Sequence, residues 1–196
     1  IEDEDAATDR DHVRAVRETF DALDAPVTYL LGNHDVERLS RADLREVLGV
    51  ERFHGRIGDT DLFSLDSAGP QGSGARGVVP DDGLAALDEG LADADDAVVF
   101  VHHPLAHRSL DDNEWFAEAP ERAFCWNRAE VEDVLARHDV RAVVNGHVHE
   151  TAHVRSRGVD HFTVTAFNKE VPGAAVTGTY AELTLGETLR LRVVEG

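Results

Sequence analysis

Side chains that can bind a metal ion recur at three points of the chain. They stand in Gly32-Asn33-His34-Asp35, His102-His103-Pro104 and Gly146-His147-Val148-His149. Neutral imidazole and side-chain oxygens together suit Zn, Mn, Fe, Co and Ni. In the third motif the two histidines are separated by one residue, so on an extended backbone they point the same way. An isolated His-x-His is more often an ordinary loop feature, and no single motif carries the inference.

Each motif directly follows an apolar run that predicts a buried strand. The runs are residues 27–31, 97–101 and 140–144. If helices cross over between them, the strands are parallel and their carboxyl ends meet at one edge of a sheet. We therefore expect the three motifs to converge there. The alternative is three unrelated polar turns, because Gly-Asn and His-Pro often end strands.

In this order, each after a strand, the motifs resemble those of the calcineurin-like metallophosphoesterase superfamily. Within it the chain is most similar to the branch of the class III cyclic-nucleotide phosphodiesterases and glycerophosphodiesterases, which Leu65-Asp66-Ser67 also resembles. The resemblance implies an α/β fold, a four-layer α/β/β/α sandwich of two mixed β-sheets flanked by helices. It also implies a single domain over residues 1–196.

The resemblance assigns metal ligands residue by residue. Family members hold two divalent ions (Mn, Fe, Zn, Co or Ni) and hydrolyse phosphate esters by a metal-bridging hydroxide. One ion would be bound by Asn33, His102 and His147, and the other by His149. The substrate implied is a small phosphodiester or phosphomonoester.

Two further residues receive catalytic roles from the resemblance. His34 would lie near the leaving-group oxygen and protonate it or stabilise its charge. Asp35 would orient His34. For His103 the resemblance implies no role as a ligand, and we expect a structural histidine at a strand end.

Two motifs of the family have no counterpart here, an Asp-x-His after the first strand and a Gly-Asp after the next. Ile1-Glu2-Asp3 resembles the residues that come directly after the Gly-Asp in the family, and the chain contains no methionine, so we expect the first strand and both motifs upstream of Ile1. This chain is then expected to bind one metal ion or none and to hydrolyse phosphate esters weakly or not at all. The alternative function is a binding or scaffold module that keeps the fold without the chemistry.

The amino-acid composition limits which partners the protein can bind and in which cellular compartment we expect it. A net charge of −20 argues against nucleic acid, because binding a phosphate backbone requires a basic face. A single cysteine, Cys125, excludes an intramolecular disulfide and is typical of a reducing compartment. No apolar run is long enough to span a bilayer. We expect a cytoplasmic protein that acts on a small phosphate ester, and the sequence indicates no oligomeric state.

The acidic residues are spread along the whole chain, with 39 Asp and Glu against 19 Lys and Arg. Such a surface repels itself in dilute buffer, whereas at 1 M salt the Debye length is only roughly 3 Å. We therefore expect a protein of a halophilic organism. Its melting temperature should rise steeply between low and molar KCl, as a thermal melt can measure, and a flat salt response would contradict this inference.

The remaining patterns predict the elements around the motifs. A first helix is expected from Thr8, with Asp11 as its capping partner, and its apolar residues are Val13, Val16, Phe20 and Leu23. A second is expected from Ser40 to Gly49 and a third over residues 84–91. A fourth is expected from Asn127, which caps it together with Glu130, to Leu135. A hairpin is expected over residues 53–65. The glycine-rich residues 68–80 predict a flexible connection. Alternating runs after His149 predict three or four antiparallel strands that form the second sheet.

Residues 104–126 have no clear period but contain three large aromatic residues, Trp115, Phe116 and Trp126. A long loop directly after a ligand-bearing strand is often a pocket wall or lid. The same aromatic residues are equally consistent with a small satellite core. The sequence leaves both interpretations open.

Overall fold

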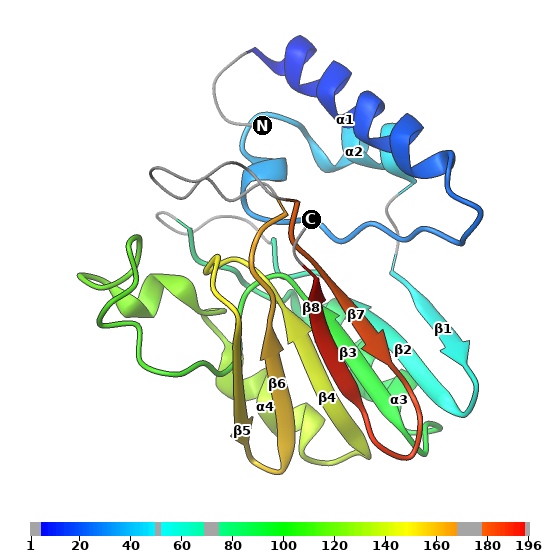
Figure 1. The fold of residues 1–196 in the computed structure, drawn as a ribbon, viewed down its shortest axis with the longest axis vertical. Coiled ribbons are helices and arrows are strands. Elements are labelled where there is room, and N and C mark those ends of the chain that lie inside the picture. The colour runs from blue at the N-terminus through cyan, green and yellow to red at the C-terminus, as the bar shows by residue number, and fades with distance from the viewer. Residues whose placement is uncertain (1–4, 50–51, 69–74, 168–177, 195–196) are drawn as a thin grey trace.

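The structure is a computed structural model that describes residues 5–49, 52–68, 75–167 and 178–194 (Figure 1). Among these residues, no helix has the length and apolar character needed to cross a membrane. In chain order the elements are α1 (Ala6–Asp21), a 3-10 helix (His34–Val36), α2 (Arg41–Leu48), β1 (His54–Ile57), β2 (Thr60–Leu65), α3 (Asp81–Leu91), β3 (Ala97–Val101), a second 3-10 helix (Pro120–Ala123), α4 (Arg128–Leu135), β4 (Val140–Asn145), β5 (Ala152–Ser156), β6 (Val159–Thr163), β7 (Tyr180–Thr184) and β8 (Arg190–Val194).

A six-stranded mixed sheet forms the centre, in the order β1-β2-β3-β4-β6-β5. The four inner strands are parallel, and the outer strands β1 and β5 pair antiparallel with their neighbours. β7 and β8 form a second, two-stranded antiparallel sheet. The expected α/β fold with two sheets and flanking helices is confirmed.

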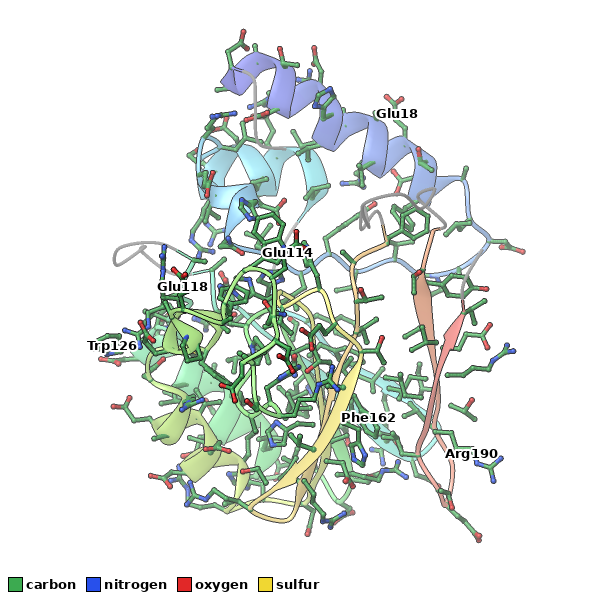
Figure 2. All side chains as sticks on the ribbon, turned by 60° about the vertical axis from the view of Figure 1, so that its left-hand side comes forward. Glu18, Glu114, Glu118, Trp126, Phe162 and Arg190 are labelled. Atoms are coloured by element: carbon green, nitrogen blue, oxygen red, sulfur yellow. The ribbon has the colours of Figure 1, made fainter. Side chains whose placement is uncertain are left out.

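Alternation along the inner strands divides the core into two faces. On one face Phe63, Val99 and Val143 pack with the apolar side chains of α3 and α4. On the other face Leu62 and Val98 pack toward the leucines of the β7–β8 region. Phe162, labelled in Figure 2, belongs to this second face. The sheet is therefore covered on both sides, as nearly continuous apolar strands require.

The strands after His149 do not all join the second sheet as predicted. β6 pairs in parallel with β4, and β5 pairs with β6, so both extend the six-stranded sheet. Only β7 and β8 form the second sheet. Alternation with a period of two reveals a half-buried strand, but it does not identify the neighbour with which that strand pairs.

Residues 27–31 are not a strand, although their apolar pattern predicts one. The described residues provide no ladder for this segment, and it runs above the upper end of β1 and β2 (Figure 1). Leu31 is nevertheless buried, against Val13 of α1 and Leu44 of α2. The apolar run therefore predicted correctly that Leu31 is buried, but the prediction that the run pairs as a strand was wrong. The buried Leu31 still fixes the start of the motif that follows it.

The first helix begins earlier than predicted. The helix was expected from Thr8, but α1 starts at Ala6. Residues 1–4 lie outside the described part of the chain. The Asp5 carboxylate caps the helix, accepting hydrogen bonds from the backbone N–H groups two and three residues on at 2.9 and 3.0 Å. Aspartate is a strong N-cap residue, so Thr8 lies inside the first turn and does not cap it.

The apolar stripe of α1 is buried only in part. Val13 is 3% exposed, whereas Val16, Phe20 and Leu23 are 45%, 44% and 55% exposed. α1 packs mainly against α2, at the end of the molecule where the parallel strands finish (Figure 1). One short helix covers only the part of the stripe around Val13.

α2 begins and ends as predicted. The Ser40 hydroxyl accepts a hydrogen bond from the backbone N–H of Asp43 at 3.1 Å, and the Asp43 carboxylate accepts one from the backbone N–H of Ser40 at 3.2 Å. This is a capping box. Gly49 ends the helix with φ 66°, a left-handed conformation that glycine adopts without strain.

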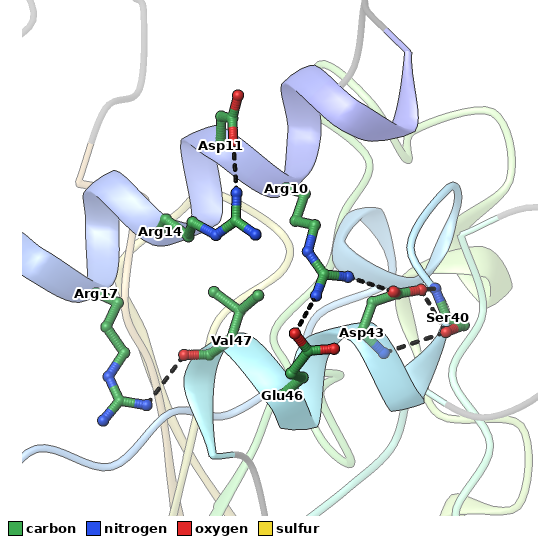
Figure 3. A network of polar contacts seen from close by, with 8 residues as sticks. All are labelled: Arg10, Asp11, Arg14, Arg17, Ser40, Asp43, Glu46 and Val47. Carbon is green, nitrogen blue, oxygen red and sulfur yellow. Dashed lines mark hydrogen bonds and ion pairs between the residues drawn. The ribbon is translucent and has the colours of Figure 1, made fainter.

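Ionic and hydrogen-bond contacts join α1 to α2 (Figure 3). Arg10 pairs with Asp43 and with Glu46, and Arg17 donates to the backbone carbonyl of Val47 at 3.0 Å. Together with the contact between Val13 and Leu44, these bonds make the two helices one unit. The loop that carries the first motif connects α1 to α2, so this unit fixes both of its ends.

Asn127 does not cap α4 as predicted. Its side-chain amide instead binds the backbone of Val79, accepting from the Val79 N–H at 3.1 Å and donating to the Val79 carbonyl at 2.9 Å. The contact joins positions 48 residues apart. Asn127 therefore ties the segment before α3 to the start of α4, and no local pattern reveals this.

His161 of β6 predicts a pH dependence of folding. It is 1% exposed, and its Nδ1 has no hydrogen-bond partner among the described residues. Burial lowers its pKa from 6.5 to about 4. Between these values the unfolded chain binds a proton that the folded chain does not, so the free energy of unfolding falls as pH decreases from 6.5 toward 4. The full contribution is up to about 3 kcal/mol.

His161→Leu should reduce this fall, as urea unfolding at pH 7.5 and 4.5 in the same salt would measure. His12→Leu, at an exposed position of α1, is the control and should keep the full fall. Equal falls in both variants would show that His161 is not the titrating group.

Candidate metal site

A metal site requires that the predicted motifs lie close together. The motif at His102 and the motif at His147 meet this requirement. β3 and β4 are parallel neighbours, and beyond them the Gly146 N–H donates to the His102 carbonyl at 3.1 Å. The His102 and His147 rings are consequently 5.1 Å apart between centroids. The parallel pairing of two strands therefore brings together histidines 45 positions apart in the chain.

The first motif joins them through Asn33. Its side chain is 3% exposed, and its Oδ1 lies 3.0 Å from His102 Nε2. Gly32 permits this approach, because a Cβ at that position would lie 2.8 Å from His102 Cε1. The residue before the asparagine must therefore be glycine if the His102 ring is to reach Asn33.

His147 occupies an unusual backbone conformation at the centre of the cluster. Its φ is 70°, in the left-handed region that residues other than glycine rarely adopt. The ring is buried, and Nε2 has no hydrogen-bond partner among the described residues. An unsatisfied buried nitrogen beside a second imidazole fits a shared ligand, and a cation is one that both nitrogens can bind.

His103 is near enough to be a third histidine ligand. The ligand atoms of His102, His103 and His147 lie within 4.8 Å of one another. However, His103 Nε2 lies 3.0 Å from the Ala75 carbonyl, which only accepts, so Nε2 carries the hydrogen. Its Nδ1 then accepts from the Ser67 hydroxyl at 2.8 Å. Both nitrogens are committed to the protein, which supports a structural histidine.

The other candidates lie around this centre. His149 has φ 54°, and it lies near enough for a charge on its ring to lower the pKa of both His102 and His147. His34 is exposed, with Nδ1 3.4 Å from Glu37 Oε1. The Asp35 carboxylate accepts from the Gly32 N–H at 2.7 Å, so it stabilises the turn that carries the motif.

Burial sets the charge state of the cluster. It lowers the pKa of His102 to about 3 and that of His147 to about 2, and nearby histidines lower both further. Burial also raises the pKa of Asp35, against the opposing effect of the Gly32 N–H. At neutral pH both central imidazoles are therefore neutral, which is the form that binds a metal ion.

These donors fit a divalent transition metal. One amide oxygen and two neutral imidazoles form a mixed N/O set that suits Mn, Fe, Co, Ni or Zn. The 3.0 Å between Asn33 Oδ1 and His102 Nε2 equals the spacing of two donors that each lie about 2.1 Å from one ion at a right angle. His147 Nε2, which has no hydrogen-bond partner among the described residues, is available to bind the same ion.

The loop over residues 104–126 forms a satellite core, which was one of the two expected roles. Phe116 is buried with Leu110, Ala123 and Val148 in a satellite core, and its ring lies 5.1 Å from that of His147. Trp115 and Trp126 are each 66% exposed, and Figure 2 shows Trp126 at the periphery. The satellite core thus forms one wall of the histidine cluster.

Sequence reasoning missed three residues that support the cluster, namely Ser67, Gly77 and Asn113. Gly77 lies in residues 68–80, which were predicted to be a flexible connection. It instead forms a bridge with Cys125, and a Cβ there would lie 2.2 Å from His103 Nδ1. The resemblance of Leu65-Asp66-Ser67 was the only signal in the sequence for Ser67. Within this loop, residues 69–74 lie outside the described residues.

Comparisons with known proteins show the fold and the family. In structure, the chain is similar to a dimetal phosphatase from Danio rerio, with a TM-score of 0.75 and 17% identity over 97% of this chain and 76% of that one. A search of curated proteins gives no significant match. The sequence model described as Calcineurin-like phosphoesterase matches residues 5–151, most of the chain. The chain therefore belongs to the calcineurin-like phosphoesterase family.

Proposed function

We propose that the protein hydrolyses a small phosphodiester or phosphomonoester with the aid of divalent metal ions. The proposal is carried by the group of Asn33, His102 and His147, whose donors are neutral and of which Asn33 and His147 are buried. Family membership supports the same reaction class. The branch of cyclic-nucleotide and glycerophosphodiester phosphodiesterases is the one we favour, from its motifs, within a single domain over residues 1–196.

Each residue has a role in this proposal. Asn33, His102 and His147 would hold one ion and His149 a second. Bound ions supply a water activated for attack and neutralise charge on the phosphate.

Two residues of the first motif act on the substrate side. His34, exposed at the rim, would donate a proton to the leaving oxygen, and Glu37 beside Nδ1 orients its ring. Asp35 would orient His34, and its carboxylate also fixes the turn by accepting from the Gly32 N–H.

The test is hydrolysis of bis-p-nitrophenyl phosphate and of p-nitrophenyl phosphate in molar KCl, with Mn(II), Co(II) or Zn(II) added to metal-free protein. We expect turnover that depends on the metal but is weak, because the Asp-x-His and Gly-Asp motifs of the family are not among these residues. The ratio of the two rates distinguishes diesterase from monoesterase. Metal content is measured on the same samples. Protein that binds metal and hydrolyses neither ester would favour a binding module that has kept the fold.

A further inference from the structure

The turn after β4 is strained, and it carries two of the proposed ligands. His147 and His149 have φ of 70° and 54°. A residue other than glycine is strained in this region, and the conformation persists only where the surrounding structure determines it. The turn therefore requires contacts that hold its backbone from outside.

Three carbonyls in and around the turn are held by hydrogen bonds. The Gly146 carbonyl accepts from the Val148 N–H at 2.9 Å, within the turn itself. The His149 carbonyl accepts from the Thr165 hydroxyl at 2.9 Å. The Val148 carbonyl, between the two histidines, accepts from Asn113 Nδ2 at 3.1 Å. This last bond comes from a loop 35 residues away in the chain.

Asn113 is well suited to hold the turn because its amide is fully used. Its Oδ1 accepts from the backbone N–H groups of Trp115 and Phe116 at 3.0 and 3.1 Å. Its Nδ2 donates to Val148 and also to the Glu150 carboxylate. An asparagine side chain offers two donors and two acceptors, and here all four are satisfied in a residue that is 4% exposed.

Apolar packing reinforces the same connection. Val148 is completely buried against Leu110, Phe116 and Ala123 of the loop. The Phe116 ring, which Asn113 positions through its backbone N–H, lies 5.1 Å from the His147 ring. The ion pair of Arg108 and Glu150 adds little, because solvent screens charges near the surface. Asn113 is therefore the buried polar link between the loop and the turn.

We propose that Asn113 is a positioning residue for the metal site. It holds the His147–His149 turn in the conformation that presents both imidazoles, so the loop before α4 and not β4 alone determines ligand geometry. This inference rests on the proposed function. It concerns the affinity for a metal ion, and it can therefore be tested without turnover.

The experiment is a Co(II) titration of metal-free protein, followed by visible absorption, for the unsubstituted protein and three variants. Asn113→Ala removes all four hydrogen bonds. Asn113→Asp keeps the two acceptor bonds to Trp115 and Phe116, but its carboxylate cannot donate to the Val148 carbonyl and repels Glu150. Asn127→Ala is the matched control, because that amide also bridges a distant backbone but at Val79, away from the turn. Melting temperatures are measured on the same samples.

We expect both Asn113 variants to weaken Co(II) binding by about 10- to 100-fold, the usual cost of losing a partner that orients a ligand. Asn127→Ala should lower the melting temperature and leave the Co(II) affinity unchanged. Equal losses of affinity in all three variants, unchanged affinity in both Asn113 variants, or failure of both to fold would overturn the inference. If the unsubstituted protein binds no Co(II), the proposed function fails and this inference fails with it.

Discussion

Replacing His147 with glycine should abolish metal-dependent ester hydrolysis and weaken Mn(II) binding by more than about 100-fold. The loss should exceed the roughly 10- to 100-fold that follows removal of a residue that only orients a ligand. The ring is buried between His102 and His103, and its Nε2 has no hydrogen-bond partner among the described residues. Glycine accepts φ of 70° at this position, so the substitution removes the imidazole without adding backbone strain. Isothermal titration with Mn(II) and the bis-p-nitrophenyl phosphate assay measure the two effects.

The matched control is His153→Ala. His153 is a half-exposed histidine of β5 that pairs with Asp160 at 2.9 Å, outside the site. This variant should keep both Mn(II) affinity and turnover. If His147→Gly folds and binds Mn(II) as the unsubstituted protein does, His147 is not a ligand and the proposed site is wrong.

Strand ends were the part of the site that the sequence could predict. An apolar run followed at once by histidine or asparagine marks the end of a buried strand, and both β3 and β4 end within one residue of the predicted boundary. Once two such strands are parallel neighbours, their terminal side chains must meet. The proximity of His102 and His147 follows from that alone.

Pairing partners and distant hydrogen bonds were the parts that it could not predict. Residues 27–31 have the same apolar pattern as β3 but form no strand, because the pattern records burial and not a neighbour. Asn127 follows the rule for a helix cap and yet binds Val79. Asn113 and Ser67 act on residues 35 and 36 positions away. Contacts of this kind have no local signature, so only the assembled fold reveals them.

His103 illustrates how a distance alone can mislead. Its nitrogens lie within reach of the other two histidines, but Ser67 and Ala75 occupy both of them. The Ser67 hydroxyl also accepts from the backbone N–H of His103 at 3.2 Å, so two hydrogen bonds join these residues. Both residues are fully buried. His103 thereby supplies a fixed wall against which the His102 and His147 rings pack.

Gly77→Ala should consequently damage both the fold and the site. The new Cβ would lie 2.2 Å from His103 Nδ1 and 2.7 Å from the backbone carbonyl of Ser67. The chain can shift little here, because the Gly77 carbonyl accepts from the Trp126 N–H at 2.7 Å and the next N–H donates to Ser67 at 2.9 Å. We expect a loss at the upper end of the roughly 1–3 kcal/mol of overpacked cores, which corresponds to a melting temperature lower by about 6–12 °C.

Gly83→Ala provides the comparison for this prediction, because its Cβ would meet nothing closer than 3.6 Å. Gly83 lies in α3, where alanine replaces glycine with a gain of up to about 1 kcal/mol, so its melting temperature should stay the same or rise. Nitrogen NMR of the His103 ring adds a local readout. The unsubstituted protein should show hydrogen on Nε2 alone, as its bond to Ala75 requires, and Gly77→Ala should lose that signature because the ring is displaced from Ser67. Equal melting temperatures for the two alanine variants, with the His103 signal unchanged, would mean that the wall formed by His103 tolerates a Cβ and does not hold the site rigid.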